Sequence, residues 1–292
     1  MILSLTPRNF TDYQLLDSGN FMKLERFGKY ITIRPEPQAV WDNGQGMREW
    51  EKQAHVKFVP KSSSSGDWVK LREMPDQWSI NYQIPNSTTI KFRLGLTSFK
   101  HVGVFPEQAV NWDYINKSIQ ELNVEKPKFL NLFAYTGGAS LAAKATGADT
   151  SHLDSIKQVV TWARENMELS GLSDIRWIVE DALKYVRREV KRGNKYHGII
   201  LDPPAYGHGP DGEKWKLEDN INEMIKGVLQ LLDDRKHFLI LNAYSLGFSS
   251  LILENLVKQN FKPENIENGE LYLQDNFDKK LPLGAFVRFI KK

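Results

Sequence analysis

The sequence predicts an α/β protein: a parallel β-sheet with helices on both faces and a terminal antiparallel hairpin, preceded by a small β-rich domain. Three observations predict this class. Strand-like and helix-like runs alternate from residue 128 to residue 292. Period-two patterns separated by turn residues dominate residues 1–98. A chain of 292 residues that is 41% hydrophobic and 26% charged is long enough to bury two modest cores.

Residues 1–98 are expected to form the small β-rich domain. Its strands are expected to pair as two hairpins, 22–27 with 30–34 and 78–84 with 88–94. A short helix is expected around residues 46–55. The polar stretch 61–68, KSSSSGDW, is interpreted as a flexible connector without a packing surface. Residues 99–127 are expected to bridge the two regions with a helix over 106–122, which proline begins.

Residues 128–292 are expected to form the catalytic domain, built on the parallel sheet. Its strands are predicted at 128–135, 149–154, 175–181, 197–204, 236–244, 269–275 and 284–292. Its helices are predicted at 139–147, 155–171, 182–193, 218–232 and 251–260. Ligands of such sheets bind at the carboxyl ends of the strands. The residues that follow each strand are therefore the candidate site residues.

Composition excludes several classes of function. The chain contains no cysteine, so disulfides, thiolate metal sites and a cysteine nucleophile are excluded. Its six histidines never fall at helical spacing, so we expect no metal. No apolar run is long enough for a membrane span and no leader is visible, which predicts a cytoplasmic protein without a membrane partner. The net charge is +3, and residues 1–98, with 13 basic and 10 acidic residues, account for all of it. That excess is a hint of where a polyanion docks.

The first three strand exits carry the signals of a nucleoside-containing cofactor. Gly137 and Gly138 follow the first strand and allow close backbone approach to a ligand, or simply pack the turn. Asp154 ends the second strand 17 residues after Gly137, near the interval at which an acid binds a ribose diol, or it caps the next helix. Asp181 and Ala182 follow the third strand, where adenine recognition and a helix N-cap are equally plausible.

The fourth exit, ILDPPAYGHGPDG, predicts the acceptor side of the site. A dehydrogenase G-x-G-x-x-G fingerprint is not matched by YTGGASLAA, and dehydrogenase chemistry does not require an Asp-Pro-Pro-aromatic exit. Methyl transfer can use one, because a rigid Pro203-Pro204 turn fixes backbone carbonyls. With Asp202 they can accept hydrogen bonds from an amine, while Tyr206 offers a ring for stacking. The exit is interpreted as a clamp for a flat nitrogen-bearing substrate.

The motifs NLFAYTGGAS, LDSIKQVVTWARENMELSGL, VEDALKYV and ILDPPAYGHGPDGEKWKLED together resemble those of class I S-adenosylmethionine-dependent methyltransferases, within the group that modifies bacterial (23S-type) ribosomal RNA. The N-terminal part is similar to the extra β-rich domain of one branch of that group. The resemblance implies a Rossmann-like seven-stranded sheet, S-adenosylmethionine as cofactor and S-adenosylhomocysteine as product.

The resemblance also implies roles for individual residues. The methionine part of the cofactor would contact Tyr135, Thr136, Gly137 and Gly138. Its nucleoside would contact Asp154, Ser155, Asp181 and Ala182. The bridge residues Phe105, Gln108 and Trp112 would close over the cofactor, although ordinary helix packing is equally expected for Trp112. The methyl group and the acceptor would face Asp202, Pro203, Pro204 and Tyr206. On the loop that follows, RNA contacts or plain solvation are equally expected for His208, Lys214, Trp215 and Lys216.

The missing cysteines are a departure from relatives that methylate carbon 5 of cytosine, which need a thiolate to activate the ring. That route is excluded here. The predicted function is methylation of a base nitrogen of ribosomal RNA, with guanine and adenine nitrogens favoured. A protein side chain or a small molecule as acceptor stays open as the alternative, and a non-catalytic scaffold is disfavoured by intact motifs at several strand exits.

Overall fold

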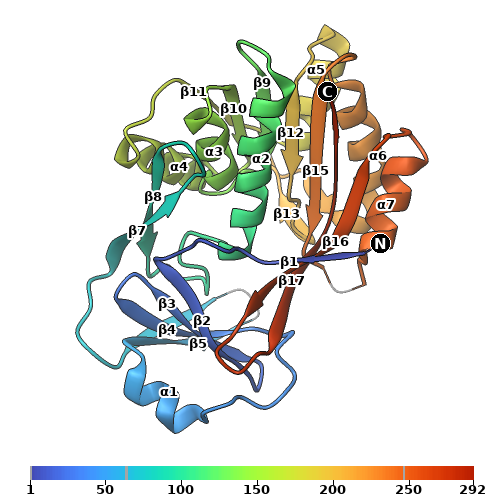
Figure 1. Ribbon diagram of the computed structural model, residues 1–292. Helices are drawn as coiled ribbons and strands as arrows, with labels where there is room; N and C mark the ends of the chain where they lie inside the picture. The colour runs from blue at the N-terminus through green and yellow to red at the C-terminus, as the bar shows by residue number, and fades with distance from the viewer. Residues whose placement is uncertain (1, 63–64, 246) are drawn as a thin grey trace.

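The computed structural model describes residues 2–62, 65–245 and 247–292, in which a large sheet flanked by helices lies above a smaller β-rich region (Figure 1). The large sheet has the order β1-β16-β17-β15-β12-β9-β10-β11. Its strands are β1 (Leu3–Leu5), β9 (Lys128–Leu132), β10 (Asp149–Asp154), β11 (Ile175–Val179), β12 (Gly198–Leu201), β15 (His237–Ala243), β16 (Ile266–Gln274) and β17 (Lys280–Lys291). All neighbours are parallel except at β17, which is antiparallel to β15 and β16. The predicted α/β class with its terminal hairpin is confirmed.

The sheet has one strand more than the seven expected, because β1 pairs in parallel with β16. A strand of three residues is too short to show a period-two pattern. The close approach of β1 to β16 explains why residue 269 is a glycine. A Cβ at that position would lie 1.9 Å from the carbonyl oxygen of Leu3.

Helices cover both faces of the large sheet. They are α2 (Ala109–Leu122), α3 (Gly138–Ala145), α4 (Lys157–Leu169), α5 (Ala182–Arg192), α6 (Leu217–Gln230) and α7 (Ser250–Lys258). Alternate strand residues point to opposite faces: Leu130 and Ile199 belong to the core under α5, α6 and α7, whereas Phe129 and Ile200 belong to the core under α2 and α3. Among the described residues, no helix is long and apolar enough to cross a membrane.

The smaller region contains a five-stranded sheet, here called the N-terminal sheet, whereas a separate hairpin from the same part of the sequence lies beside α4, whose Trp162 donates to the carbonyl of Arg93 at 2.8 Å (Figure 1). The N-terminal sheet consists of β2 (Tyr13–Gly19), β3 (Met22–Phe27), β4 (Tyr30–Pro35), β5 (Val56–Pro60) and β6 (Gly66–Lys70), with α1 (Met47–Gln53) beside it. The hairpin pairs β7 (Gln77–Gln83) with β8 (Thr89–Gly95). Both predicted hairpins, β3–β4 and β7–β8, are confirmed.

The interpretation of residues 61–68 as a flexible connector is wrong for its last part. Gly66 and Trp68 belong to β6, which pairs with β5. The Trp68 ring packs on Phe58 with centroids 5.1 Å apart, and its indole N–H donates to the carbonyl of Thr97 at 2.7 Å. The polar serine run gave no sequence signal for β6, which is held by packing of its Trp68 ring on Phe58 of β5. Residues 63 and 64 lie outside the described residues.

Candidate active site

The turn between β9 and α3 has an unusual backbone. β9 ends at Leu132, earlier than the predicted residue 135, and three of the residues that follow have positive φ: Phe133 (+56°), Tyr135 (+49°) and Gly137 (+93°). For the two aromatic residues this left-handed conformation is strained, and such strain persists where the surroundings fix it. Here the Thr136 hydroxyl donates to the carbonyl of Gly103 at 2.6 Å, which ties the turn to the bridge segment.

Gly138 is required by a neighbouring side chain. A Cβ on Gly138 would lie 2.5 Å from Cζ2 of Trp112. Trp112 comes from α2, is 3% exposed and stacks on Phe92 with ring centroids 5.1 Å apart. The sequence left open whether this glycine admits a ligand or packs the turn. The indole of Trp112 packs against it, and contact with a ligand stays a prediction.

The carboxylate of Asp154 connects the turn after β9 to the end of β10 by hydrogen bonds. It accepts from the backbone N–H groups of Tyr135 at 2.9 Å and of Ile156 at 3.0 Å. Burial raises its pKa despite these hydrogen bonds. Asp154 therefore fixes Tyr135 beside the end of β10, with Ser155 next in the chain. Whether it also binds a ribose stays a prediction.

Asp181 acts as a helix cap in this structure. Its carboxylate accepts from the backbone N–H of Lys184 at 2.8 Å and so caps α5, whose first residue is the buried Ala182. This is the alternative that the sequence left open for Asp181. It does not exclude a contact between this exit and an adenine ring.

Asp202 directly follows β12 and is partly buried, and its carboxyl group accepts a hydrogen bond from a carboxamide. Gln108 donates its Nε2 to Oδ2 of Asp202 at 3.1 Å. The Oε1 atom of Gln108 in turn accepts from Asn111 at 2.8 Å and from Asn242 at 2.9 Å. Because Oε1 accepts from two amides, the Gln108 carboxamide is fixed with its N–H group toward the carboxyl. Desolvation raises the pKa of Asp202 to about 7.

Sequence reasoning missed Asn111 and Asn242 as members of this network. A signal existed for Asn242, since it is the one polar residue between Phe238 and Ala243 on β15, the strand beside β12. Buried polar groups must find partners, so an amide in such a strand indicates a network.

After the two prolines of the Asp-Pro-Pro exit the chain forms a short hairpin, where the sequence predicted a loop. β13 (Tyr206–His208) pairs with β14 (Lys214–Lys216). The indole N–H of Trp215 donates to the carbonyl of Pro204 at 2.7 Å, and its ring packs on Phe133 at 4.8 Å. Tyr206 is 58% exposed, and its hydroxyl lies 3.1 Å from Nε2 of His208. The Tyr206 ring is thus open to solvent, while Trp215 holds the turn.

One cavity brings the first and fourth strand exits together. Its volume is about 50 Å³. Of the residues predicted from the sequence, it is lined by Phe105, Gln108, Trp112, Tyr135, Thr136, Gly137, Gly138 and Asp202. The lining given by the structure does not include the predicted residues Asp154, Ser155, Asp181, Ala182, Pro203, Pro204 and Tyr206. Asn131, Phe133 and Ala134 line it without having been predicted.

This cavity fits the reactive centre of a sulfonium cofactor. Phe105 and Tyr135 present aromatic rings with centroids 5.1 Å apart, and Asp202 supplies a carboxyl beside them. Aromatic faces and carboxylates both favour a cation. A volume of about 50 Å³ is well below the roughly 300–1,000 Å³ of typical ligand pockets, so the nucleoside of such a cofactor would extend beyond the cavity. Among the described residues, no group of acidic or histidine side chains could hold a metal ion.

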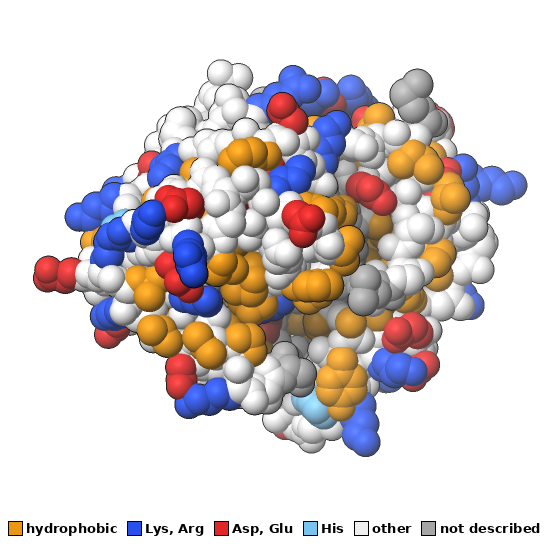
Figure 2. Space-filling view, turned by 90° about the horizontal axis from the view of Figure 1, so that it is seen from below, with side chains coloured by type: hydrophobic (Ala, Val, Ile, Leu, Met, Phe, Trp, Pro, Cys, Tyr) orange, Lys and Arg blue, Asp and Glu red, His pale blue; other side chains and the backbone are white. Residues whose placement is uncertain are grey.

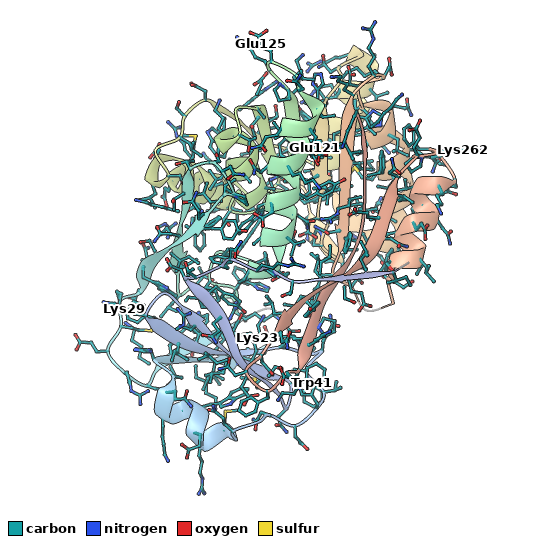
Figure 3. All side chains as sticks on the ribbon, in the orientation of Figure 1. Lys23, Lys29, Trp41, Glu121, Glu125 and Lys262 are labelled. Carbon is teal, nitrogen blue, oxygen red and sulfur yellow. The ribbon has the colours of Figure 1, made fainter. Side chains whose placement is uncertain are left out.

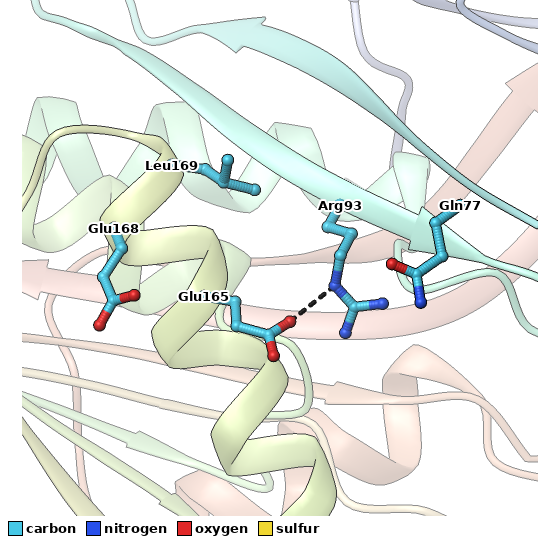
Figure 4. Close-up of a pocket in the computed structure, with 5 residues that line it drawn as sticks. All are labelled: Gln77, Arg93, Glu165, Glu168 and Leu169. Atoms are coloured by element: carbon cyan, nitrogen blue, oxygen red, sulfur yellow. Dashed lines mark hydrogen bonds and ion pairs between the residues drawn. The ribbon is translucent and has the colours of Figure 1, made fainter.

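A larger hollow of about 610 Å³ lies elsewhere, between α4 and the β7–β8 hairpin. Figure 4 shows that Arg93 points there toward Glu165, with which it forms an ion pair at 2.6 Å. None of the residues that line this larger hollow lies at a strand exit of the large sheet; the others are Gln77, Glu168 and Leu169. We therefore place the active site at the smaller cavity.

A doubly wound α/β sheet with a cavity at the carboxyl ends of two of its parallel strands, here β9 and β12, is typical of enzymes that bind a nucleoside cofactor. Residues 37–259 match the sequence profile of the S-adenosylmethionine-dependent methyltransferases. The chain belongs to this family. Its cofactor is S-adenosylmethionine.

Solved and curated relatives agree with this family. An S-adenosylmethionine-dependent methyltransferase from Agrobacterium tumefaciens superposes with a TM-score of 0.90 and 34% identity, over 99% of this chain and 94% of that one. Ribosomal RNA large subunit methyltransferase K of Neisseria meningitidis is 25% identical over 85% of this chain and 69% of its own length. Methyltransferase K/L of Shewanella frigidimarina is 31% identical over 52% of this chain, but the match covers only 21% of that protein.

Proposed function

We propose that the protein methylates a nitrogen of a base in RNA, with ribosomal RNA as the first substrate to test. The observation that carries the proposal is that Asp202, at the Asp-Pro-Pro exit, shares one cavity with the glycine turn of the cofactor. Both relatives described above that carry a substrate name are named for ribosomal RNA of the large subunit. For an RNA substrate of this kind, we propose the cytoplasm as the place of action.

The cofactor brings an activated methyl group, so the protein mainly orients the acceptor and excludes water. We assign these tasks to the β12 exit. Gln108 holds the Asp202 carboxyl at 3.1 Å, and Trp215 already uses the Pro204 carbonyl at 2.7 Å. We assign the hydrogen bonds from the acceptor to Asp202 and to the Pro203 carbonyl, because the Pro204 carbonyl already accepts from Trp215. Tyr206, exposed on β13, offers its ring to the base.

The absence of cysteine supports a nitrogen acceptor. Attack of a thiolate on a pyrimidine ring is impossible in this chain. Ring and exocyclic nitrogens need no covalent activation. Asp202→Ala is expected to abolish turnover while sparing affinity for S-adenosylhomocysteine, which carries no sulfonium charge.

We further propose that residues 1–98 dock the substrate and that the bridge 99–127 connects them to the catalytic part, 128–292. The proposed docking of the substrate does not depend on a single patch of basic side chains. In Figure 2 hydrophobic side chains gather in the middle of the lower face, while basic and acidic side chains are interspersed around them. Several lysines of the N-terminal sheet are paired with acids, such as Lys57 with Glu51 at 2.8 Å and Lys70 with Asp76 at 2.7 Å. Shape and stacking would then contribute more than net charge.

The decisive experiment compares modified nucleosides by mass spectrometry in ribosomal RNA from cells with and without the protein. The purified protein should then methylate the RNA from the deficient cells, using labelled S-adenosylmethionine. The Asp202→Ala variant is the matched control, since it should bind cofactor and transfer nothing. If both RNAs are identical and a protein fraction is labelled instead, the acceptor is a protein side chain and the RNA proposal fails.

A further inference from the structure

The N-terminal sheet and the large sheet are joined by a buried chain of polar side chains beside the acceptor side. Glu36, directly after β4, is 3% exposed. Its Oε1 accepts from the hydroxyl of Tyr244 at 2.6 Å, and its Oε2 pairs with Lys23 on β3 at 3.2 Å. Figure 3 shows Lys23 within the N-terminal sheet. Tyr244 follows β15 and is separated from Glu36 by 208 residues.

The register of the sheet places Tyr244 at the acceptor side. Leu201 on β12 pairs with Leu241 on β15. Three residues beyond this pair, the chain reaches Pro204 after one strand and Tyr244 after the other. Because the two strands are parallel neighbours, both residues leave the sheet at its carboxyl edge.

The hydrogen-bond network of Asp202 reaches the strand that carries Tyr244. Gln108, which donates to Asp202 at 3.1 Å, accepts from Asn242 at 2.9 Å. Asn242 belongs to β15 and lies two residues before Tyr244. Burial raises the pKa of Glu107, the residue before Gln108, to about 8, and the charge of Asp202 adds to this rise. Tyr244 is thus close in the chain to the network that holds Asp202, and its hydroxyl reaches the N-terminal sheet through Glu36.

The Tyr244 ring itself is held but not covered. The residue is 41% exposed although its hydroxyl is bonded to a buried carboxylate. Burial opposes ionisation of Glu36, yet Lys23 and the Tyr244 hydroxyl lower its pKa, so the carboxylate stays charged. A charged acceptor makes a stronger hydrogen bond than a neutral one. The ring is thus an open, fixed aromatic face.

We propose that Tyr244, held by Glu36 and Lys23 of the N-terminal sheet, is a stacking surface for the acceptor base beside Asp202. A flat heteroaromatic base fits, because stacking needs only a ring face and no fixed pattern of donors and acceptors. The N-terminal sheet then shapes the acceptor site directly, in addition to any docking role. This inference rests on the proposed RNA function.

Steady-state methylation of ribosomal RNA from deficient cells, with labelled S-adenosylmethionine, tests the inference. Tyr244→Ala removes the ring and should raise the KM for RNA about 10- to 100-fold. Tyr244→Phe keeps the ring and loses only the tether, so its KM should stay within about fivefold of the wild type. Phe277→Ala, which removes a ring that is also 41% exposed but lies in the β16–β17 turn, is the matched control and should keep the wild-type KM. Calorimetry with S-adenosylhomocysteine should give equal affinities for all variants, which verifies that they are folded.

Two results would overturn the inference while the proposed function stands: a Tyr244→Ala variant whose KM matches the wild type, or a Tyr244→Phe variant as impaired as Tyr244→Ala. The second result would mean that Tyr244 only tethers the two sheets. A wild-type protein that binds S-adenosylhomocysteine but methylates no RNA would overturn the proposed function and the inference with it.

Discussion

Asp202 predicts a pH dependence that can be measured in two independent ways. Its carboxyl has a pKa near 7 because burial disfavours the charged form, whereas the ordinary value is 3.8. If the ionised carboxylate accepts a hydrogen bond from the acceptor, activity rises with pH. The ionised fraction increases from about one tenth at pH 6 to about nine tenths at pH 8. We therefore expect kcat/KM to rise about tenfold over this range, with a midpoint near pH 7.

The free energy of unfolding should change in the opposite direction. In the folded state Asp202 keeps its proton up to about pH 7, while in the unfolded chain it loses it near 3.8. The folded state thus binds more protons between these values, and its stability falls as pH rises through that window. A shift of roughly three units corresponds to at most about 4 kcal/mol. Asp202→Asn, which cannot ionise, should remove this loss and be more stable than the wild type at pH 8.

The assay is methyl transfer from labelled S-adenosylmethionine between pH 5.5 and 9 at constant ionic strength, with urea unfolding at the same pH values. Asp202→Asn should be about 100-fold slower or worse and should lack the midpoint. Glu223→Gln, a surface change on α6, should keep the wild-type profile. If Asp202→Asn retains a midpoint, Asp202 is not the titrating group. A retained midpoint near 8 would instead point to Glu107, whose pKa burial raises to about 8.

Three substitutions test the rest of the site. Gly138→Ala places a Cβ 2.5 Å from the Trp112 ring, so urea unfolding should show a loss of about 1–3 kcal/mol; equal stability would mean that the ring can move. Asp154→Ala should weaken S-adenosylhomocysteine binding at least about tenfold by calorimetry, and unchanged affinity would place the ribose elsewhere. Trp215→Phe loses the N–H bonded to the Pro204 carbonyl and should lower kcat about 10- to 100-fold at constant cofactor KM; wild-type kcat would show that the bond is dispensable.

The strand exits could be predicted from sequence because they depend on local chemistry. Asp154 ends β10, Asp202 directly follows β12, and Gly137 lies in the turn after β9. The parallel topology then brings these exits to one edge of the sheet. Gln108, which the resemblance placed near the cofactor, also lines the cavity, whereas its partner Asn242 was not predicted. Residue type and position in the chain thus indicate which residues meet at this edge, while their roles stay predictions.

The contacts between distant segments could not be predicted. No local pattern tells that Gly138 must be small because Trp112 of α2 lies against it. The same holds for Tyr244, whose partner Glu36 comes from another sheet. Each residue alone has an ordinary explanation, such as a tight turn or an exposed ring. The contacts of Gly138 and Tyr244 become apparent only when α2 and the N-terminal sheet are packed against the carboxyl edge of the large sheet.

The N-terminal sheet is too closely tied to the large sheet to act as a separate docking module. Lys279, in the β16–β17 turn, donates to the buried carboxylate of Asp17 at 2.9 Å, and Ser18 donates to Asp275 at 2.7 Å. Charged groups of this kind lose their partners together if the sheets separate, which is costly for buried ions. The hydrogen bond from Tyr244 to Glu36 is a further contact between the two sheets. If the substrate docks on the N-terminal sheet and Tyr244 stacks on the acceptor base, as we propose, both would then act on one connected structure.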